Sequence, residues 1–309
     1  PCWLNSAERA RDCIEMATIA LQTDDEELRN KPGIIGGINT NSPLLLDDSQ
    51  AEGLIEFARA GQPIHVTPFT LAGAMSPVTI GGSLVQQNAE ALAGIVLGQA
   101  AAIGAPVFYG HFTSNVDMRT GSPAFGTPEY AKSVLVSAQM ARRYGLPIRS
   151  SNTTASAVVD AQATYESDMS INACINGHVN VMMHAGGWLE GGLTCSFEKL
   201  ILDAELLQMQ AAVLEPLDLS ETTLGLDAIA EVGPAGHFFG TSHTLERYED
   251  AFYRPILSDW RNFESWHEDG EKTATQRAHA IWKQLLRDYE KPPIDPAIED
   301  ELEAYVAKR

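Results

Sequence analysis

Side chains that could bind a small ligand stand where short apolar segments of the sequence end. Five polar residues occupy such places: Asn39, Thr67, His111, Asn152 and His184. His184 is followed by Ala-Gly-Gly, and small residues of this kind let a ligand approach the backbone closely. Trp188 comes directly after them, where its ring can offer an aromatic face to a cation, although core packing is the ordinary role of a tryptophan.

Two phenylalanines lie close to the same segment ends. Phe69 follows Thr67-Pro68, and Phe112 follows His111. For a lone strand histidine such as His111, the alternative is a structural role with its hydrogen bonds made inside the fold. The residue types together indicate a site of polar and aromatic groups.

Two loops are further candidates, each with a plain alternative. The segment Gly236–Gly240 places His237 and Phe238 between glycines, which fits either a substrate wall or a packing corner. The loop Asn115–Glu129 is long for a connection between a strand and a helix, which fits either a lid or a surface excursion.

The familiar sequence signatures of catalysis are missing. No GxGxxG follows a strand, and neither GxxxxGK[ST] nor HExxH occurs, which argues against dinucleotide, phosphate-loop and HExxH-type metal chemistry. No His or Cys residues have zinc-ligand spacing, no two carboxylates are spaced as an acid–base pair, and lysines are scarce at segment ends. The pattern favours a protein that positions a ligand and brings little acid–base machinery of its own.

The elements that must position these residues follow a repeating pattern of strand and helix. Helices are expected at Ser49–Gly61, Asn88–Gly104 and Glu129–Gly145, each after a short β-branched or aromatic segment. The joins read Gly-x-Pro, in which the glycine ends a helix and the proline leads into the next strand. A parallel α/β fold is therefore predicted, and a parallel barrel gathers its chemistry at the carboxyl ends of its strands.

Helices are also expected at both ends of the chain. Ser6 precedes an amphipathic helix that ends near Leu21, and Phe197–Leu214 reads as a long helix that Pro216 stops. From His243 onward the sequence is charged and rich in aromatic residues, which is typical of helices across an outer surface. We expect one domain over residues 1–309, with barrel units in 1–242 and a helical extension packed on the barrel in 243–309.

Composition limits the classes of function. The 309 residues are 44% hydrophobic, which is enough for one large core, and the formal net charge is −20. This charge argues against nucleic acid and anionic membrane surfaces as partners. No run of 18 apolar residues and no leader is visible, so a cytoplasmic protein is expected, and the four cysteines are read as buried, reduced residues. The abrupt start at Pro1 is read as the start of a fragment.

Several long segments resemble the trimethylamine methyltransferase family. They include GQPIHVTPFTLAGAMSPVTIGGSLVQQNAEALAGIVLGQ, NVDMRTGSPAFGTPE, DAQATYES, HAGGWLEGGL and GPAGHFFGTSHTLERY, in the order that the family has them. The resemblance covers nearly the whole chain. It implies a TIM (β/α)8-type barrel with C-terminal helices, here without one or more N-terminal strands, because family members are longer at that end.

The resemblance also implies the reaction. Members that act on trimethylamine carry pyrrolysine, whereas Arg149–Asp160, where we expect that position, reads RSSNTTASAVVD. We therefore expect methyl transfer from a quaternary amine, such as glycine betaine, to the Co(I) of a corrinoid (cobalamin) that a partner protein carries, with no cofactor or metal bound to this chain. Trimethylamine as the substrate and a non-catalytic quaternary-amine binding protein are the alternatives, and self-association stays open.

The implied substrate assigns roles to the candidate residues. Arg149 and His184 would hold a carboxylate. The methylammonium group would lie against Trp188, Phe69, Phe112 and Phe238. The remaining binding candidates are His111, Asn152 and His237.

Overall fold

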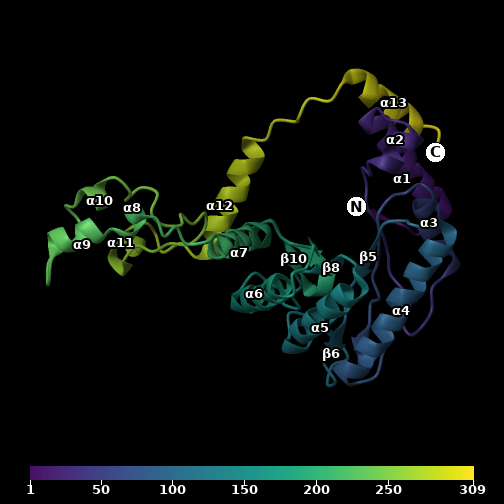
Figure 1. Cartoon of the computed structure of the whole chain (residues 1–309), viewed down its shortest axis with the longest axis horizontal. Coiled ribbons are helices and arrows are strands. Elements are labelled where there is room, and N and C mark those ends of the chain that lie inside the picture. Colours follow the sequence, from purple (N-terminus) through teal and green to yellow (C-terminus); the bar gives the residue numbers. More distant parts are fainter.

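The computed structural model describes residues 1–309 and is built around a parallel sheet that curls into a half-barrel (Figure 1). Its strands lie in the order in which the chain makes them, and each is followed by at least one helix. The six strands are β1 (Cys2–Trp3), β2 (Gly36–Ile38), β3 (Ile64–Val66), β5 (Val107–Gly110), β8 (Ile148–Ser151) and β9 (Val181–Met183). A singly wound sheet of this kind places every carboxyl end at one edge.

The helices that follow the strands cover the outer face of the sheet. They are α1 (Ala7–Leu21) and α2 (Asp25–Asn30), α3 (Asp48–Arg59), α4 (Ile80–Ala101), α5 (Pro128–Tyr144), α6 (Ala161–Asn176) and α7 (Phe197–Leu214). Alternation along the strands separates the two faces, as in β3, where Ile64 and Val66 join the buried core beneath the helices and His65 points to the inner face.

Local signals in the sequence explain where the helices begin and end. Ser6 accepts a hydrogen bond from the N–H of Arg9 at 3.1 Å, which confirms the predicted cap of α1. Gly145 ends α5 with a φ of 67°, a conformation that glycine adopts without steric cost. The expectation of a helix start at Asn88 was wrong, because α4 begins at Ile80, where Thr79 caps it through the N–H of Gly82 at 3.3 Å.

Two small sheets lie in the loops beyond the carboxyl ends of the strands. One holds β4 (Leu71–Ala72), β6 (Ser114–Val116) and β7 (Pro123–Ala124). The other pairs β10 (Trp188–Leu189) with β11 (Thr194–Cys195). Residues 114–124 therefore form a β-hairpin, and the predicted loop Asn115–Glu129 ends inside α5, which begins at Pro128.

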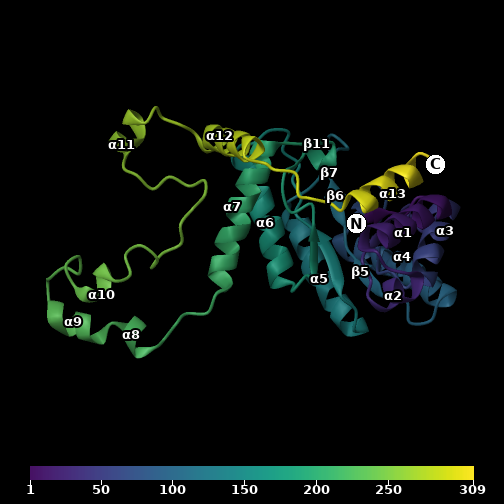
Figure 2. The same ribbon diagram turned by 90° about the horizontal axis from the view of Figure 1, so that it is seen from above.

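The C-terminal third leaves the half-barrel and returns to it. Residues 215–255, which we call the arm, follow α7 and carry α8 (Glu221–Leu224), α9 (Leu226–Val232) and α10 (Ser242–Leu245). Figures 1 and 2 both show the arm projecting from the body. The chain then returns through α11 (Phe263–Glu268) and α12 (Ala274–Arg287), which packs on α7, and ends in α13 (Pro296–Val306), which packs on α1.

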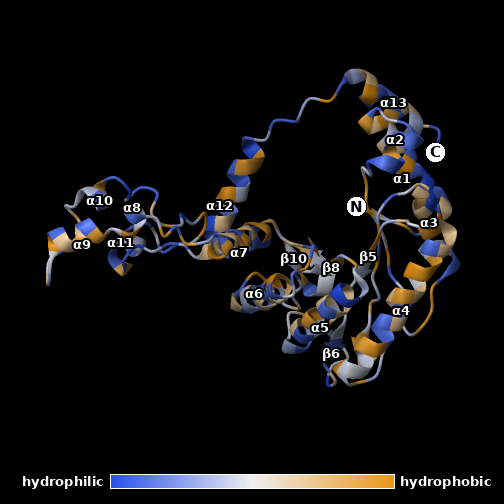
Figure 3. Ribbon diagram, viewed as in Figure 1, coloured by the Kyte–Doolittle hydropathy of each residue, from blue (hydrophilic) through white to orange (hydrophobic).

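Figure 3 shows apolar residues on the helices of the arm as well as on those of the body. Many large apolar residues of the arm are exposed: Leu217, Phe239 and Phe252, which lie outside its helices, keep more than four fifths of their surface accessible to solvent. The cysteines also differ from the prediction, since Cys174 is buried whereas Cys195 is exposed. No helix has the length and apolar character needed to cross a membrane.

Candidate functional site

The five polar residues predicted at one mouth do follow directly on the carboxyl ends of the strands. Asn39, Thr67, His111, Asn152 and His184 come immediately after β2, β3, β5, β8 and β9. Their side chains do not all face the same way. Asn39 is exposed, whereas Thr67, His111 and Asn152 are buried and His184 is half-buried.

His111 points away from the inner face, into the layer between sheet and helices. Its Nδ1 lies 3.0 Å from the Ser150 hydroxyl and its Nε2 lies 2.8 Å from the Ser133 hydroxyl of α5. Burial lowers the pKa of His111 to about 3, so the ring is neutral at pH 7. This is the structural role that the sequence left as the alternative for a lone strand histidine.

Five rings gather at the mouth and form what we call the aromatic cluster: Phe69, Phe112, Phe125, His184 and Trp188. The rings of His184 and Trp188 stack with centroids 5.3 Å apart and planes inclined by 13°. Phe112 stands edge-on to both, with its ring centroid 6.0 Å from each of theirs. Phe69, His184 and Trp188 are half-buried, so the cluster retains contact with solvent.

Arg149 lies beneath this cluster without an acidic partner. Its neighbours on β8 point to the outer face, where Ile148 joins the core and Ser150 bonds to His111, so alternation turns Arg149 inward. The side chain is 1% exposed, and its guanidinium carbon lies 5.5 Å from the centroid of Phe112. Nη1 donates to the carbonyl of His111 at 3.3 Å, while Nε has no partner. Burial lowers the pKa of Arg149 to about 10, which still leaves it charged at pH 7.

Two further residues fix the position of the loop after β9. His184 has a φ of 54°, an uncommon conformation for a residue with a side chain, and its Nδ1 lies 3.1 Å from the Ser151 hydroxyl. Asn152 donates from Nδ2 to the carbonyl of Ala185 at 3.2 Å, and its buried Oδ1 has no partner. Burial, and secondarily the charge of Arg149, lower the pKa of His184 to about 4.

Two residues of this region were not predicted from the sequence. Phe125 belongs to the aromatic cluster because the β6–β7 hairpin folds over the mouth, and its ring lies 5.3 Å from that of Trp188. His65 lies on the inner face of β3, with Nδ1 2.9 Å from the Thr67 hydroxyl. Burial and then the charge of Arg149 lower its pKa to about 3. Phe125 was visible only as a single ring between Ala124 and Gly126, and His65 only as a single ring between the β-branched Ile64 and Val66, which is too weak a signal by itself.

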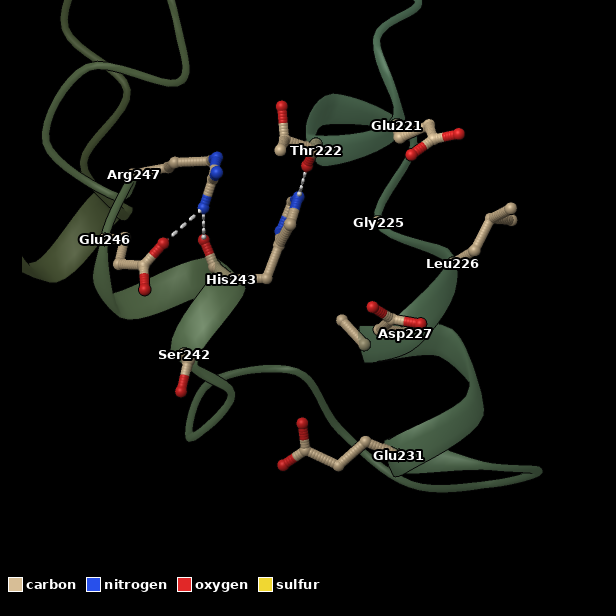
Figure 4. A pocket seen from close by; sticks show the side chains of 11 residues that line it. Glu221, Thr222, Gly225, Leu226, Asp227, Glu231, Ser242, His243, Glu246 and Arg247 are labelled. Carbon is tan, nitrogen blue, oxygen red and sulfur yellow. Dashed lines mark hydrogen bonds and ion pairs between the residues drawn. The ribbon is translucent and has the colours of Figure 1, made fainter.

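The structure does not bring Phe238 and His237 to the aromatic cluster. Both lie in the arm, at the far end of the molecule from the mouth, and both are exposed (Figures 1 and 2). The arm has an open hollow of its own, about 400 Å³, between α8, α9 and α10 (Figure 4). Four carboxylates line it, with one arginine and one histidine: Glu221, Asp227, Glu231, Glu246, Arg247 and His243.

The mouth can therefore bind charged groups, while its histidines are poor proton donors. Aromatic faces attract a cation, at roughly 0.5–2 kcal/mol for each well-placed ring. Arg149 offers a buried positive charge to an anion. The neighbouring histidines, His65 and His184, are neutral at pH 7 because burial disfavours their charged forms.

Comparison with known proteins gives a consistent result over the whole chain. The profile of the family described as trimethylamine methyltransferase (MTTB) matches residues 2–309. A glycine betaine methyltransferase of Desulfitobacterium hafniense (strain Y51) is 39% identical over 312 residues, which cover 100% of this chain and 65% of that protein. The trimethylamine methyltransferase MttB of Methanosarcina barkeri is 33% identical over 286 residues, which cover 92% of this chain and 57% of that protein.

A second protein of Desulfitobacterium hafniense (strain DSM 10664 / DCB-2), also a trimethylamine methyltransferase MttB, is 31% identical over 294 residues. The chain thus spans between 57% and 65% of the length of these curated relatives.

Proposed function

The chain belongs to the trimethylamine methyltransferase family, and on that premise we propose that the protein moves a methyl group from a quaternary amine to the Co(I) of a corrinoid protein. Glycine betaine or a close analogue is the proposed substrate. The 39% identity to a glycine betaine methyltransferase over the whole chain supports this choice.

The observation that carries the proposal is the unpaired Arg149 beside the aromatic cluster. A buried charge without a partner is costly, and a carboxylate that enters the site would pair with it. Glycine betaine has a carboxylate close to its trimethylammonium group, and in this proposal the carboxylate pairs with Arg149 while the ammonium lies against the rings of Phe69 and Trp188. Trimethylamine has no anionic group for Arg149, and its protonated form would be repelled by the guanidinium.

The neutral histidines suit a reaction without proton transfer. A quaternary ammonium leaves as a neutral tertiary amine, so its displacement requires no general acid. The corrinoid of the partner protein would supply the nucleophile when it is docked. Residues of this chain would bind the substrate, orient one N-methyl group toward the mouth and exclude water, which is catalysis by orientation. The half-buried rings at the carboxyl edge fit an acceptor that arrives from outside.

The same premise extends to the architecture. Six strands in sequential order, each followed by a helix, support the inference that the half-barrel is part of an eight-stranded (β/α)8 barrel. Two more strands between β9 and β1 would close it. The coverage of the relatives, 65% at most among those compared, leaves enough sequence to supply them.

The proposal is tested with the full-length protein and a corrinoid protein reduced to Co(I). We expect glycine betaine to give the absorption spectrum of methyl-Co(III). Trimethylamine should give none, because Arg149–Asp160, where we expect the pyrrolysine of trimethylamine-specific members, holds only standard residues. Choline, which has a hydroxyl instead of a carboxylate, and carnitine, whose carboxylate is farther from the ammonium, complete the panel. They test what the site requires of the anionic group. Binding of glycine betaine without methyl-Co(III) formation would identify a binding protein instead, and methyl transfer from trimethylamine alone would overturn the substrate assignment.

A further inference from the structure

An ion pair on α7 lies fully buried directly below the loop that carries the aromatic stack. Lys199 and Asp203 are one helical turn apart, neither side chain is exposed, and the Nζ of Lys199 donates to Oδ1 of Asp203. Nζ also donates to the Ser167 hydroxyl of α6 at 2.7 Å. Burial raises the pKa of Asp203 and lowers that of Lys199, because each charged form loses its hydration.

The second carboxylate oxygen of Asp203 binds the backbone of the residue that precedes Trp188 of the aromatic cluster. Oδ2 accepts a hydrogen bond from the N–H of Gly187 at 2.8 Å. Gly187 directly precedes Trp188, and its φ of 85° is a conformation that residues with side chains rarely adopt. Its carbonyl accepts from the N–H of Ser196 at 3.0 Å, so this peptide segment is held at both ends.

The neighbouring loop is held by a buried carboxylate in a similar way. Glu166 of α6 accepts from the N–H groups of Ala155 at 2.8 Å and Ser156 at 3.0 Å. The carbonyl of Ser156 in turn accepts from the N–H of Glu190 at 2.8 Å, which joins this loop to the one that carries Trp188. The loops at the mouth are therefore set by buried acids on the helices beneath them.

We propose that Asp203, with Lys199 as its counter-charge, is a positioning residue that holds the stacked rings of Trp188 and His184 through Gly187 and so sets the selectivity of the mouth for a cationic ligand. This inference rests on the proposed quaternary-amine substrate. A cation gains from a ring only when it lies over the ring face, so a displaced Trp188 keeps its apolar contact and loses most of the electrostatic attraction.

The structure allows the hydrogen bond to Gly187 to be separated from the buried charges. The double variant Asp203→Ala/Lys199→Met removes both charges together and removes the acceptor for Gly187. The double variant Asp203→Asn/Lys199→Met also removes both charges, yet keeps an oxygen at the same place. The two differ mainly in the Gly187 hydrogen bond. Both remove the charge of Lys199, so any effect on the nearby buried carboxylate of Glu166 is common to the two variants and cancels in their comparison.

The test compares two ligands of the same shape in the full-length protein by calorimetry. Glycine betaine carries a trimethylammonium group, whereas 3,3-dimethylbutanoate carries an uncharged tert-butyl group in its place. The measured quantity is the affinity for glycine betaine divided by the affinity for 3,3-dimethylbutanoate. We expect this ratio to fall about tenfold in the Ala/Met variant and to stay within about twofold of wild type in the Asn/Met variant. A merely structural loss would weaken both ligands alike and leave the ratio unchanged.

Glu205 gives a matched control on the same helix. It is buried like Asp203 and accepts from the N–H groups of Ile256 at 2.8 Å and Leu257 at 3.1 Å, where the chain returns from the arm. Glu205→Gln should leave the ligand ratio unchanged.

Amide hydrogen exchange of Gly187, followed without ligand, gives a second readout. We expect faster exchange in the Ala/Met variant than in the Asn/Met variant. Equal ligand ratios and equal Gly187 exchange in the two double variants would overturn the role of Asp203. Failure of the wild-type protein to bind either ligand would instead contradict the proposed substrate, and the exchange at Gly187 would still decide whether Asp203 holds the loop.

Discussion

The half-barrel and the arm both contain large apolar residues, but the half-barrel buries them whereas the arm exposes them to solvent. In the half-barrel, Phe57 is completely buried and even Arg149 is 1% exposed. In the arm, Phe252 is 82% exposed. The difference follows from connectivity, because each βα unit packs against the unit before it, whereas the arm has no such neighbour along the chain. Apolar content alone therefore does not predict where a core forms.

The comparison also separates two kinds of polar site. At the mouth, charged and aromatic groups are buried together, so each interaction is strengthened by the low dielectric of the interior. In the hollow of the arm, Arg247 and Glu246 pair at the surface, where water and salt weaken their attraction. Of these two sites, the mouth combines burial with polar atoms that have no partner, whereas the hollow of the arm is open.

The largest expected effect is the loss of stability of the half-barrel in acid. His65 and His111 have pKa values of about 3 in the folded protein, against about 6.5 when unfolded, so the unfolded chain binds more protons between these values. Stability is therefore complete above pH 6.5 and declines as the pH falls, by up to about 1.4 kcal/mol per pH unit for each histidine. Urea unfolding from pH 7.5 to 4.5 measures this slope.

The histidine variant His111→Asn provides the check. It should lower the slope of the unfolding free energy against pH by the contribution of one histidine. It also reduces stability at pH 7, because the hydrogen bonds to Ser133 and Ser150 are lost. Carboxylates with lowered pKa values, such as Asp47 at about 2, lose their contribution only at lower pH. A flat profile between pH 7.5 and 4.5 would show that the histidines are accessible to water, as the large apolar side chains of the arm such as Phe252 are.

The second prediction contrasts one phenylalanine from each region. Phe57→Ala should lower the free energy of unfolding by about 3–5 kcal/mol, because it empties a fully buried site in the main core. Phe252→Ala should change it by less than about 0.5 kcal/mol, as is usual for exposed positions. Chemical unfolding of both variants gives the comparison. A large cost for Phe252→Ala would mean that the arm is covered in solution.

The third prediction concerns the charge at the mouth. Arg149→Met should weaken glycine betaine binding by about 1.5–3 kcal/mol, the range for a hydrogen bond to a charged group. Tetramethylammonium, which has no carboxylate, should bind the variant at least as tightly as wild type, because a repulsive charge has been removed. Arg119→Met in the exposed β6–β7 hairpin is the control and should leave both affinities unchanged. Equal losses for the two ligands would contradict the role assigned to Arg149.

Much of the fold was predictable because its signals are local. The Gly-x-Pro joins identified the βα units, and Gly145 has the left-handed conformation that such a join requires. The sequence also placed His184 and Trp188 together, since only three small residues separate them. Their parallel stacking was not predictable, because it depends on Gly187 being held by Asp203 from another element.

The remaining parts of the site depend on contacts between distant segments. Phe125 joins the aromatic cluster only because β6 and β7 pair, and a single phenylalanine in a loop gives no sign of this. The inward direction of Arg149 follows from strand alternation, but its lack of an acidic partner is a property of the whole fold. The sequence offered Phe69 and Phe238 for the same methylammonium group, with a packing corner as the alternative for Phe238, and the course of the arm that carries Phe238 separates the two (Figure 1).

The smallest expected effect compares two threonine caps. Thr127 caps α5 in the half-barrel through the N–H of Tyr130 at 3.1 Å, and Thr241 caps α10 in the arm through the N–H of Thr244 at 3.3 Å. Thr127→Ala should cost about 1 kcal/mol, the usual value for a lost cap. Thr241→Ala should cost less than half of that in global unfolding, because the four-residue α10 can unfold without disturbing the sheet. Equal costs, measured by urea unfolding under the same conditions, would show that the arm and the half-barrel unfold as one cooperative unit.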